Sequence, residues 1–219
     1  MTKSIDADLR TRDKVRTRAE ILAVATREFA ERGYAGARVD EIAALTRTTK
    51  RMIYYYFGGK EQLFVAVLED AYARIRENEQ SLAVADLDPV DAIRRLAEGT
   101  YDHHTAHQDA LRLVAIENIH RGHHIAQSEA LTNLSLPVVH LIDDILVRGR
   151  AAGSFRADVD AIDVHMMISS YCVFPINNRH TFGMLFNRDL MDESRREHYR
   201  TILGDAVVAW LTASGAARG

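Results

Sequence analysis

Residues 39–56 read VDEIAALTRTTKRMIYYY, which is the pattern of two short helices joined by a turn. Successive side chains on an α-helix point about 100° apart, so three adjacent tyrosines at 54–56 cannot all face one core. At least one of them must face outward. We therefore predict a helix-turn-helix that buries a small apolar set between its helices: Ile42, Ala43, Leu45 and Ile53.

The second of these helices presents polar and basic side chains at the positions that its core leaves free. An α-helix fits the major groove of DNA, and residues near its N-terminus reach base edges. Lys and Arg donate to guanine or to phosphates, and Thr and Tyr hydroxyls bond phosphates. Lys60 begins the next helix, where backbone N–H groups also suit a phosphate. The pattern indicates DNA contacts by Thr48, Thr49, Lys50, Arg51, Tyr54, Tyr55 and Lys60.

Helical periodicity continues on both sides of the helix-turn-helix. Apolar residues between Ile21 and Phe29 form a stripe that ends at Gly33, and Asp88-Pro89 is typical of a helix start. No segment shows the sustained alternation of a strand. We predict an all-α fold of about nine helices, with a three-helix N-terminal part followed by a larger helical part.

The charge of the chain is divided unevenly along its 219 residues. The net charge is −3, yet residues 1–60 hold 13 Lys and Arg against 8 Asp and Glu, and the remainder holds 15 against 23. A basic first part favours contact of that part with a polyanion, although an excess of this size also arises by chance.

The sequence predicts a cytoplasmic protein without a membrane partner. The N-terminal residues MTKSIDADLRTRDK lack an apolar secretion segment, and we find no apolar run of about 18 residues. Cys172 is the single cysteine, so no intramolecular disulfide forms, and its apolar surroundings favour a buried, inert thiol.

A resemblance to a known family covers residues 18–64, RAEILAVATREFAERGYAGARVDEIAALTRTTKRMIYYYFGGKEQLF. This segment resembles the DNA-binding domain of the tetracycline-repressor (TetR) family of bacterial transcriptional regulators. The resemblance implies a homodimer that places the third helix of each subunit in the major groove of a palindromic operator on double-stranded DNA. By position it adds Arg18 and Arg38 to the expected DNA contacts. Arg38 stands where the family usually has threonine, and Tyr56 where histidine is common, so the operator sequence stays open.

The resemblance also implies that the chain is divided into functional domains. We expect a flexible N-terminal arm at 1–13, a helix-turn-helix DNA-binding domain at 14–62, and a helical effector-binding and dimerisation domain at 63–219. A small-molecule effector would release DNA by favouring a state in which the two DNA-binding domains no longer fit their half-sites. Repression is the commoner outcome in the family. The dimer interface would come from the last two long helices, near 160–178 and 194–212, through His165, Ser169, Val173, Ile202, Ala206, Ala209 and Trp210, although an intramolecular core would use similar positions.

All ten histidines follow residue 102, and six of them lie within 103–124. The pairs His103/His107 and His120/His124 have the i,i+4 spacing that can place two imidazoles on one metal ion, with Glu117 as a third ligand. A metal-responsive regulator is therefore an alternative, although no cofactor and no metal are our main expectation. The other reading is a polar effector pocket, for which we expect Tyr101, His104, Glu117, Asn118, Arg121, Tyr171, Phe174 and Asn178.

No motif of an enzyme is present in the sequence. It contains no GxSxG, no P-loop and no dinucleotide-binding glycine pattern after a strand, and Gly58-Gly59-Lys60 lacks the upstream glycine of a P-loop. We expect no catalytic residues; a helical enzyme stays as the alternative from a different class.

Overall fold

A computed structural model describes residues 2–133 and 136–213. Within these residues the chain forms eleven α-helices and two 3₁₀ helices, so the predicted all-α class is confirmed with more helices than expected. Contacts divide the chain into two compact units. We call Met1–Ala71 with Arg112–Thr132 the head unit, and Tyr72–Leu111 with Asn133–Gly219 the body unit. Two helices, α4 (Lys60–Ser81) and α6 (Gln108–Ile119), contribute residues to both.

The head unit contains the predicted helix-turn-helix, in which Ile42, Ala43 and Ile53 are buried as expected but Leu45 is 60% exposed. Helices α2 (Val39–Leu45) and α3 (Lys50–Phe57) follow α1 (Thr2–Gly36). The Thr49 side chain caps α3 by accepting a hydrogen bond from the Met52 amide, and Gly58 ends the helix in the left-handed conformation at φ 87°. The residues that form the core beneath these helices are fully buried: Ile21, Phe29, Ile42, Ile53 and Phe64.

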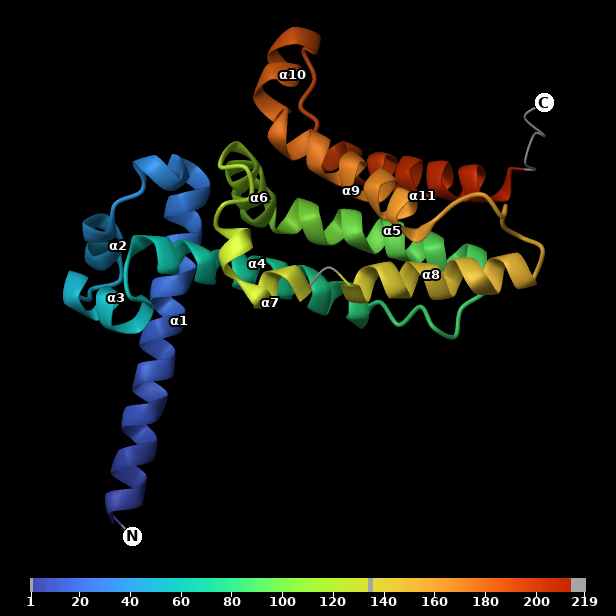
Figure 1. Ribbon diagram of the computed structural model, residues 1–219. Helices are drawn as coiled ribbons and strands as arrows, with labels where there is room; N and C mark the ends of the chain where they lie inside the picture. Colours follow the sequence, from blue (N-terminus) through green and yellow to red (C-terminus); the bar gives the residue numbers. More distant parts are fainter. Residues whose placement is uncertain (1, 134–135, 214–219) are drawn as a thin grey trace. The chain divides into compact units, whose positions relative to one another are not determined.

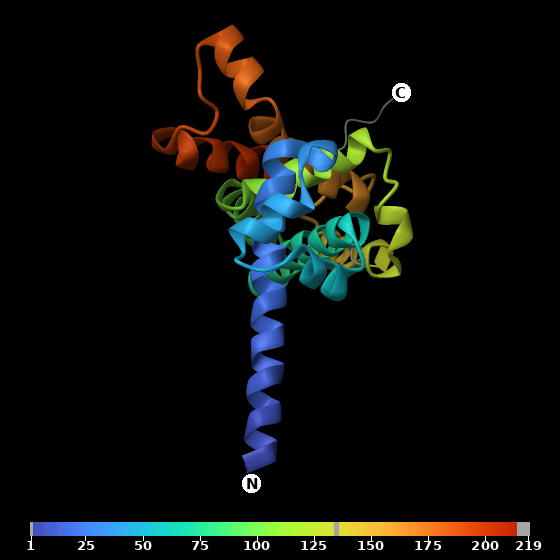
Figure 2. The ribbon, with the colours of Figure 1, turned by 90° about the vertical axis from the view of Figure 1, so that its left-hand side faces the viewer.

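Helix α1 differs from the expectation at both ends. We expected residues 1–13 to be a flexible arm, whereas the structure describes helix from Thr2 onward, which Figure 1 and Figure 2 show as a long rod. No proline or glycine lies between Thr2 and Arg32, so nothing in the sequence interrupts the helix. Gly33 departs from helical geometry at φ 70°, but one further turn continues to Gly36.

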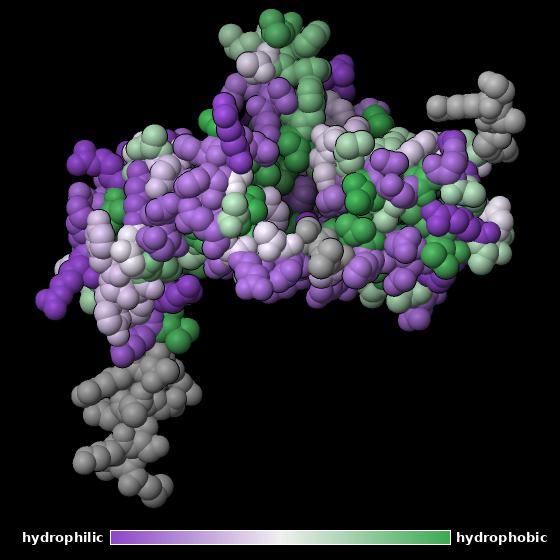
Figure 3. Space-filling model, in the orientation of Figure 1, coloured by the Kyte–Doolittle hydropathy of each residue, from purple (hydrophilic) through white to green (hydrophobic). Residues whose placement is uncertain are grey.

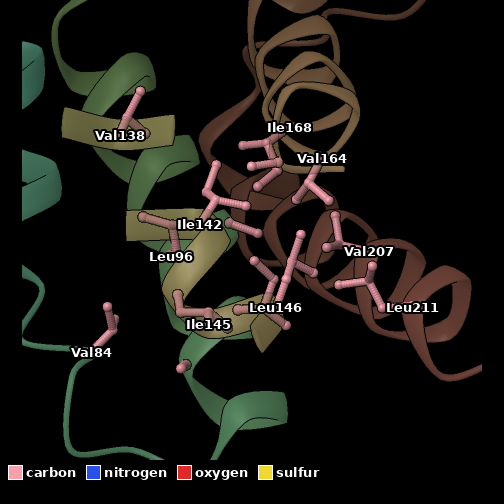
Figure 4. Close-up of a cluster of buried hydrophobic side chains, with 14 of the residues drawn as sticks. Val84, Leu96, Val138, Ile142, Ile145, Leu146, Val164, Ile168, Val207 and Leu211 are labelled. Atoms are coloured by element: carbon pink, nitrogen blue, oxygen red, sulfur yellow. The ribbon is translucent and has the colours of Figure 1, made fainter. Parts of the chain in front are cut away.

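Four long helices build the body unit: α5 (Pro89–Ala106), α8 (Leu136–Ala151), α9 (Ala161–Asn177) and α11 (Arg196–Thr212). Asp88 caps α5 by accepting from the Val90 amide at 2.9 Å, and Pro89 takes the first helical position, as the sequence predicted. Figure 4 shows apolar side chains from all four helices pointing toward one another: Leu96, Ile142, Ile145, Leu146, Val164, Ile168, Val207 and Leu211.

One part of the body unit corrects the expectation about apolar runs. The segment Glu129–Ala151 is long and apolar enough to cross a membrane by length and composition. Val138, Ile142, Ile145 and Leu146 of this segment are buried in the body core, which accounts for its apolar character. Cys172 is buried in the same core, and burial raises the pKa of its thiol to about 12, as expected for an inert thiol.

A short helix, α10 (Arg179–Phe186), follows α9 and exposes three consecutive large apolar side chains. Met184 is 87% exposed, Leu185 78% and Phe186 65%. In Figure 1 and Figure 2 this helix projects from the other helices of its unit, and Figure 3 shows hydrophobic residues gathered on it. The rings of Phe174, Phe182 and Phe186 form a contact series that leads from α9 onto α10.

The remaining elements are short. They are α7 (Glu129–Asn133) and the 3₁₀ helices η1 (Ile125–Gln127) and η2 (Glu193–Arg195).

Candidate DNA-binding surface and effector site

Helix α3 presents one polar face to solvent and one apolar face to the head core. Ile53 and Phe57 are buried, whereas Tyr54 and Tyr55 are 48% and 66% exposed. The side chains of Thr49, Lys50 and Arg51 are exposed and Thr48 is half-buried. The prediction that the tyrosine run cannot all face inward is therefore confirmed.

Three basic residues surround this face with different local constraints. The Arg18 guanidinium lies over the Phe57 ring at 5.0 Å, which orients it beside α3. Arg38 is exposed at the extended N-cap of α2, and its side chain makes no capping hydrogen bond. The Lys60 ammonium lies 4.9 Å from the centre of the Tyr34 ring and donates to the Ala35 carbonyl at 3.4 Å. Burial lowers the pKa of Lys60.

A buried, hydrogen-bonded pair of a carboxylate and an imidazole joins the end of α6 to the head core. Glu117 and His124 are 1% and 2% exposed. The Glu117 carboxylate accepts from the His124 amide at 2.7 Å, the Ile125 amide at 3.1 Å and His124 Nδ1 at 2.7 Å. The His124 ring packs against the rings of Tyr34 and Phe64, at 4.6 and 4.8 Å. We call this Glu117–His124 arrangement the clasp.

The clasp changes the interpretation of three expected pocket residues. Glu117, Asn118 and Arg121 lie in the head unit, not among the body helices. Glu117 is fully engaged by its hydrogen bonds, so it is unavailable to a ligand. Asn118 is exposed and donates to the Val114 carbonyl at 3.0 Å. Arg121 is exposed in a turn with φ 59°. Only packing over a long sequence separation brings Glu117 to the head core, and the local pattern did not show it.

The body unit holds a group of buried and half-buried polar side chains from three helices, which we call the polar cluster: Arg76 and Glu79 of α4, His103 and His104 of α5, and His165 of α9. Arg76 Nη1 donates to Glu79 Oε2 at 2.6 Å. Burial raises the pKa of Glu79 to about 7 against the opposing effect of Arg76. Burial lowers the pKa of His103 to about 4 and that of His104 to about 3, and it also lowers the pKa of His165. The three imidazoles are therefore neutral at pH 7.

Two atoms of the polar cluster, Arg76 Nε and His103 Nε2, are buried without a hydrogen-bond partner among the described residues. The Tyr199 hydroxyl, elsewhere in the body unit, is in the same condition. Most buried polar atoms in native proteins are paired, so these atoms have hydrogen-bonding capacity that the described residues do not use.

Two expected pocket residues, Tyr101 and Tyr171, lie together inside the body unit with ring centres 6.3 Å apart. Burial raises the pKa of both to about 12. Tyr101 lies one helical turn from His104, so these two expected pocket residues lie on the same side of α5. Phe174 is half exposed and Asn178 donates to the Phe174 carbonyl at 3.2 Å, which places both at the end of α9, away from the core cluster.

The sequence did not single out Arg76 and Glu79, although a pattern was available. Glu79 follows the buried residues Ala71 and Ile75 at steps of four, which places a carboxyl group on the buried side of α4. A charged residue on an apolar stripe is the feature that would have identified it.

The metal site that the sequence analysis held as an alternative does not form among the described residues. Among the described residues, no group of three or more His, Cys, Asp or Glu side chains could hold a metal ion. The rings of His103 and His107 stack at 4.4 Å, and His107 Nδ1 lies 2.9 Å from the His103 carbonyl oxygen. In the other pair, Nδ1 of His124 is engaged by Glu117. The i,i+4 spacing thus stacks His103 on His107, and in the second pair His124 is taken up by Glu117, seven residues before it.

An exposed helix-turn-helix on a helical body that buries polar groups defines a class of DNA-binding regulators. Residues 21–67 match the sequence model of "Bacterial regulatory proteins, tetR family", and residues 89–207 match "Tetracyclin repressor-like, C-terminal domain". The chain belongs to the tetracycline-repressor family of bacterial transcriptional regulators, as the resemblance predicted.

Individual relatives agree with this assignment. The chain is 36% identical over 203 residues to the HTH-type transcriptional repressor NicS of Pseudomonas putida, covering 93% of this chain and 96% of that protein. It is 40% identical over 112 residues to the HTH-type transcriptional repressor SCO4008 of Streptomyces coelicolor, covering 51% and 54%. A solved tetR-family regulatory protein from Rhodococcus RHA1 shares the fold, with a TM-score of 0.72 at 17% identity over 90% of this chain and 98% of that chain.

A second solved structure describes the molecular basis for control of antibiotic production by bacterial hormones. It matches with a TM-score of 0.63 at 26% identity and covers 91% of this chain and 99% of that chain. The chain is therefore a ligand-responsive DNA-binding regulator by family, and neither the metal alternative nor the enzyme alternative is favoured.

Proposed function

We propose that this chain is a cytoplasmic, homodimeric repressor that binds a palindromic operator through α3 and leaves it when a small molecule binds the body unit. The exposed polar face of α3 carries this proposal, because its Tyr54 and Tyr55 side chains are exposed where a buried helix would hide them. The name of the P. putida relative, a transcriptional repressor, supports repression over activation.

The proposed DNA contacts are the nine residues expected from the sequence. Thr49, Lys50 and Arg51 lie at the N-terminus of α3, where a helix in the major groove reaches base edges. Arg18, Arg38 and Lys60 surround that helix and suit phosphates. The full set is Arg18, Arg38, Thr48, Thr49, Lys50, Arg51, Tyr54, Tyr55 and Lys60.

Fluorescence anisotropy tests the proposed contacts. The probe is a duplex from the intergenic DNA beside the protein's own gene, compared with a shuffled duplex over a series of salt concentrations. The double variant Arg51→Ala, Tyr54→Phe should bind the first duplex roughly tenfold or more weakly, since each good base contact contributes about 1–3 kcal/mol. The matched control Arg195→Gln removes an exposed charge from η2 and should leave affinity unchanged. Unchanged affinity of the double variant would contradict the contact assignment.

We place the dimer interface on α9 and α11, at His165, Ser169, Val173, Ile202, Ala206, Ala209 and Trp210. None of these residues is fully buried, whereas their neighbours Val164, Ile168 and Val207 are. Ile162 and Met166 add exposed apolar surface to α9, at 63% and 60% exposure. Apolar side chains left exposed in this way favour association with a second copy.

The proposed roles divide the chain at 14–62 for DNA binding and 63–219 for effector binding and dimerisation. Residues 112–132 modify this division because they pack within the head unit. The head unit therefore contains all the proposed DNA contacts together with a segment that the sequence assigned to the effector domain.

A further inference from the structure

We propose that the effector site of the body unit takes a small organic acid with one negative charge, whose carboxylate is held by Arg76 of the polar cluster. This inference rests on the proposed function and names the chemical class of its effector. It follows from the donors that Arg76 leaves unused, the groups around it and the space beside it.

Arg76 has hydrogen-bonding capacity that the protein does not use. Its side chain is only 10% exposed. Nη1 is engaged by Glu79, whereas Nε is buried without a partner among the described residues. A guanidinium carries five donors, and the edge formed by Nε and the neighbouring terminal nitrogen matches the two oxygens of a carboxylate. An unpaired donor of this kind, buried on a cation, favours an anion as the missing partner.

The surroundings of Arg76 also favour an anion. The neighbouring imidazoles of His104 and His165 are neutral, and Arg76 itself contributes to lowering their pKa values. Glu79 is the carboxyl group that pairs with Arg76, and burial raises its pKa to about 7. A proton on Glu79 leaves the positive charge of Arg76 without a counterion.

A cavity of about 320 Å³ lies beside Arg76 and Glu79. Val138 and Leu141 of α8 give it an apolar wall, and the exposed Asp144 also lines it. This volume is at the small end of ligand sites, which favours a compact acid over a long lipid chain. The negative charge of Asp144 disfavours a second carboxylate on the ligand. The preferred ligand is therefore a monocarboxylate with a compact apolar body.

Isothermal titration calorimetry on the full chain tests this inference with three probes of matched shape. Benzoate carries the carboxylate, benzamide is its neutral counterpart, and benzylamine carries the opposite charge; hexanoate serves as a second monocarboxylate. We expect benzoate or hexanoate to bind and benzamide and benzylamine to bind at least tenfold more weakly. Equal binding of benzamide, preferential binding of benzylamine, or no binding of either acid at 10 mM would overturn the proposal.

Two variants test the assigned residues separately. Arg76→Gln should reduce benzoate affinity at least tenfold, because charge-assisted bonds from a guanidinium are lost. Leu141→Trp keeps Arg76 but fills the cavity, so it should also abolish benzoate binding. This variant keeps the site testable if Arg76→Gln fails to fold. Arg195→Gln is the control and should bind benzoate as the natural chain does. Retained affinity in a folded Arg76→Gln variant, or in Leu141→Trp, would contradict the site.

The same samples separate failure of this inference from failure of the proposed function. Operator binding without any acid binding would overturn only the effector class. Acid binding that depends on Arg76, in a protein that binds no DNA or keeps its DNA at saturating benzoate, would support the carboxylate site and contradict the effector-released repressor.

Discussion

Lys50 forms an ion pair with Asp40 on the surface that we propose faces DNA, with Nζ 3.1 Å from the carboxylate. Both side chains are more than half exposed, so the pair contributes little to stability. It nevertheless keeps a negative charge beside a proposed phosphate or base contact. A DNA phosphate must compete with Asp40 for the Lys50 ammonium.

Asp40→Asn should therefore tighten DNA binding by about two- to fivefold at low salt, the range that an exposed ion pair allows. The gain should shrink as salt rises, because screening weakens the repulsion between Asp40 and phosphate. Anisotropy at two salt concentrations measures it, with Asp91→Asn in the exposed first turn of α5 as the control. Weaker binding of Asp40→Asn would place Lys50 away from the DNA.

The clasp predicts a different result, on stability. Glu117→Gln leaves two backbone amides and His124 without a charged acceptor in a buried place. Breaking such a pair costs about 3–5 kcal/mol of the free energy of unfolding. Glu129→Gln, an exposed carboxylate at the start of α7, is the control and should change little. Urea unfolding measures the free energy of unfolding of both variants, and equal values would contradict the stabilising contribution that we assign to the clasp.

The pKa of His104 predicts a pH dependence. Folding lowers this pKa from 6.5 to about 3, so the unfolded chain binds a proton that the folded chain does not. The resulting loss of stability begins as pH falls through 6.5 and continues toward pH 3. His104→Gln removes this loss, so the free energy of unfolding of the natural chain relative to the variant should fall by about 2 kcal/mol between pH 7 and pH 5. Parallel pH profiles in urea unfolding would contradict the burial of this imidazole.

Glu79 contributes a pH dependence of stability with the opposite sign. Its raised pKa disfavours the folded state as pH rises from 4.5 to 7. This contribution is present in both the natural chain and the His104→Gln variant, so the comparison between them cancels it.

At the scale of elements, local patterns predicted the helices whose ends are determined locally. Thr49 and Gly58 fix the two ends of α3, and Asp88-Pro89 fixes the start of α5, through their own backbone and side chains. α10 escaped prediction, because the helix has no buried residue to give an apolar stripe. The clasp escaped prediction for another reason, since the rings of Tyr34 and Phe64 that pack against its His124 come from distant parts of the chain.

The faces of α9 and α11 predict the oligomeric state. Ala209→Glu places a charge on an exposed position of α11 that we assign to the interface. Burying this charge against a second copy is unfavourable, so the dissociation constant of the dimer should rise roughly tenfold or more. Light scattering after size exclusion measures the mass, and operator affinity should fall with it. Ala126→Glu, exposed in η1, is the control. An unchanged dimer would support the intramolecular reading of these positions.

The whole molecule is built from units that do not follow the order of the chain. The head unit takes residues before Ala71 and then Arg112–Thr132, and the body unit takes what lies between and after. Sequence patterns gave the all-α class and the helix-turn-helix, since both depend on short stretches. They could not give this interleaving, because it depends on which buried surfaces fit one another.

A fragment of residues 1–62 should therefore fold poorly by itself. It lacks Leu63, Phe64, Val67 and Leu68, which are fully buried on α4, and it lacks the clasp. We expect a low helix content by circular dichroism and no cooperative melting, compared with the full chain. Cooperative melting of the fragment would show that the first three helices alone suffice.

The clasp has a consequence for anyone who exchanges parts between regulators. A chimera made by joining the first 62 residues of one relative to the remainder of another would set a foreign residue 34 against the His124 ring of the clasp. The DNA specificity of such a hybrid would come from its first helices, but the stability of its head unit would depend on a segment more than fifty residues later in the chain. Transferring the DNA-binding specificity to another regulator therefore requires grafting two discontinuous segments together, residues up to 71 and residues 112–132.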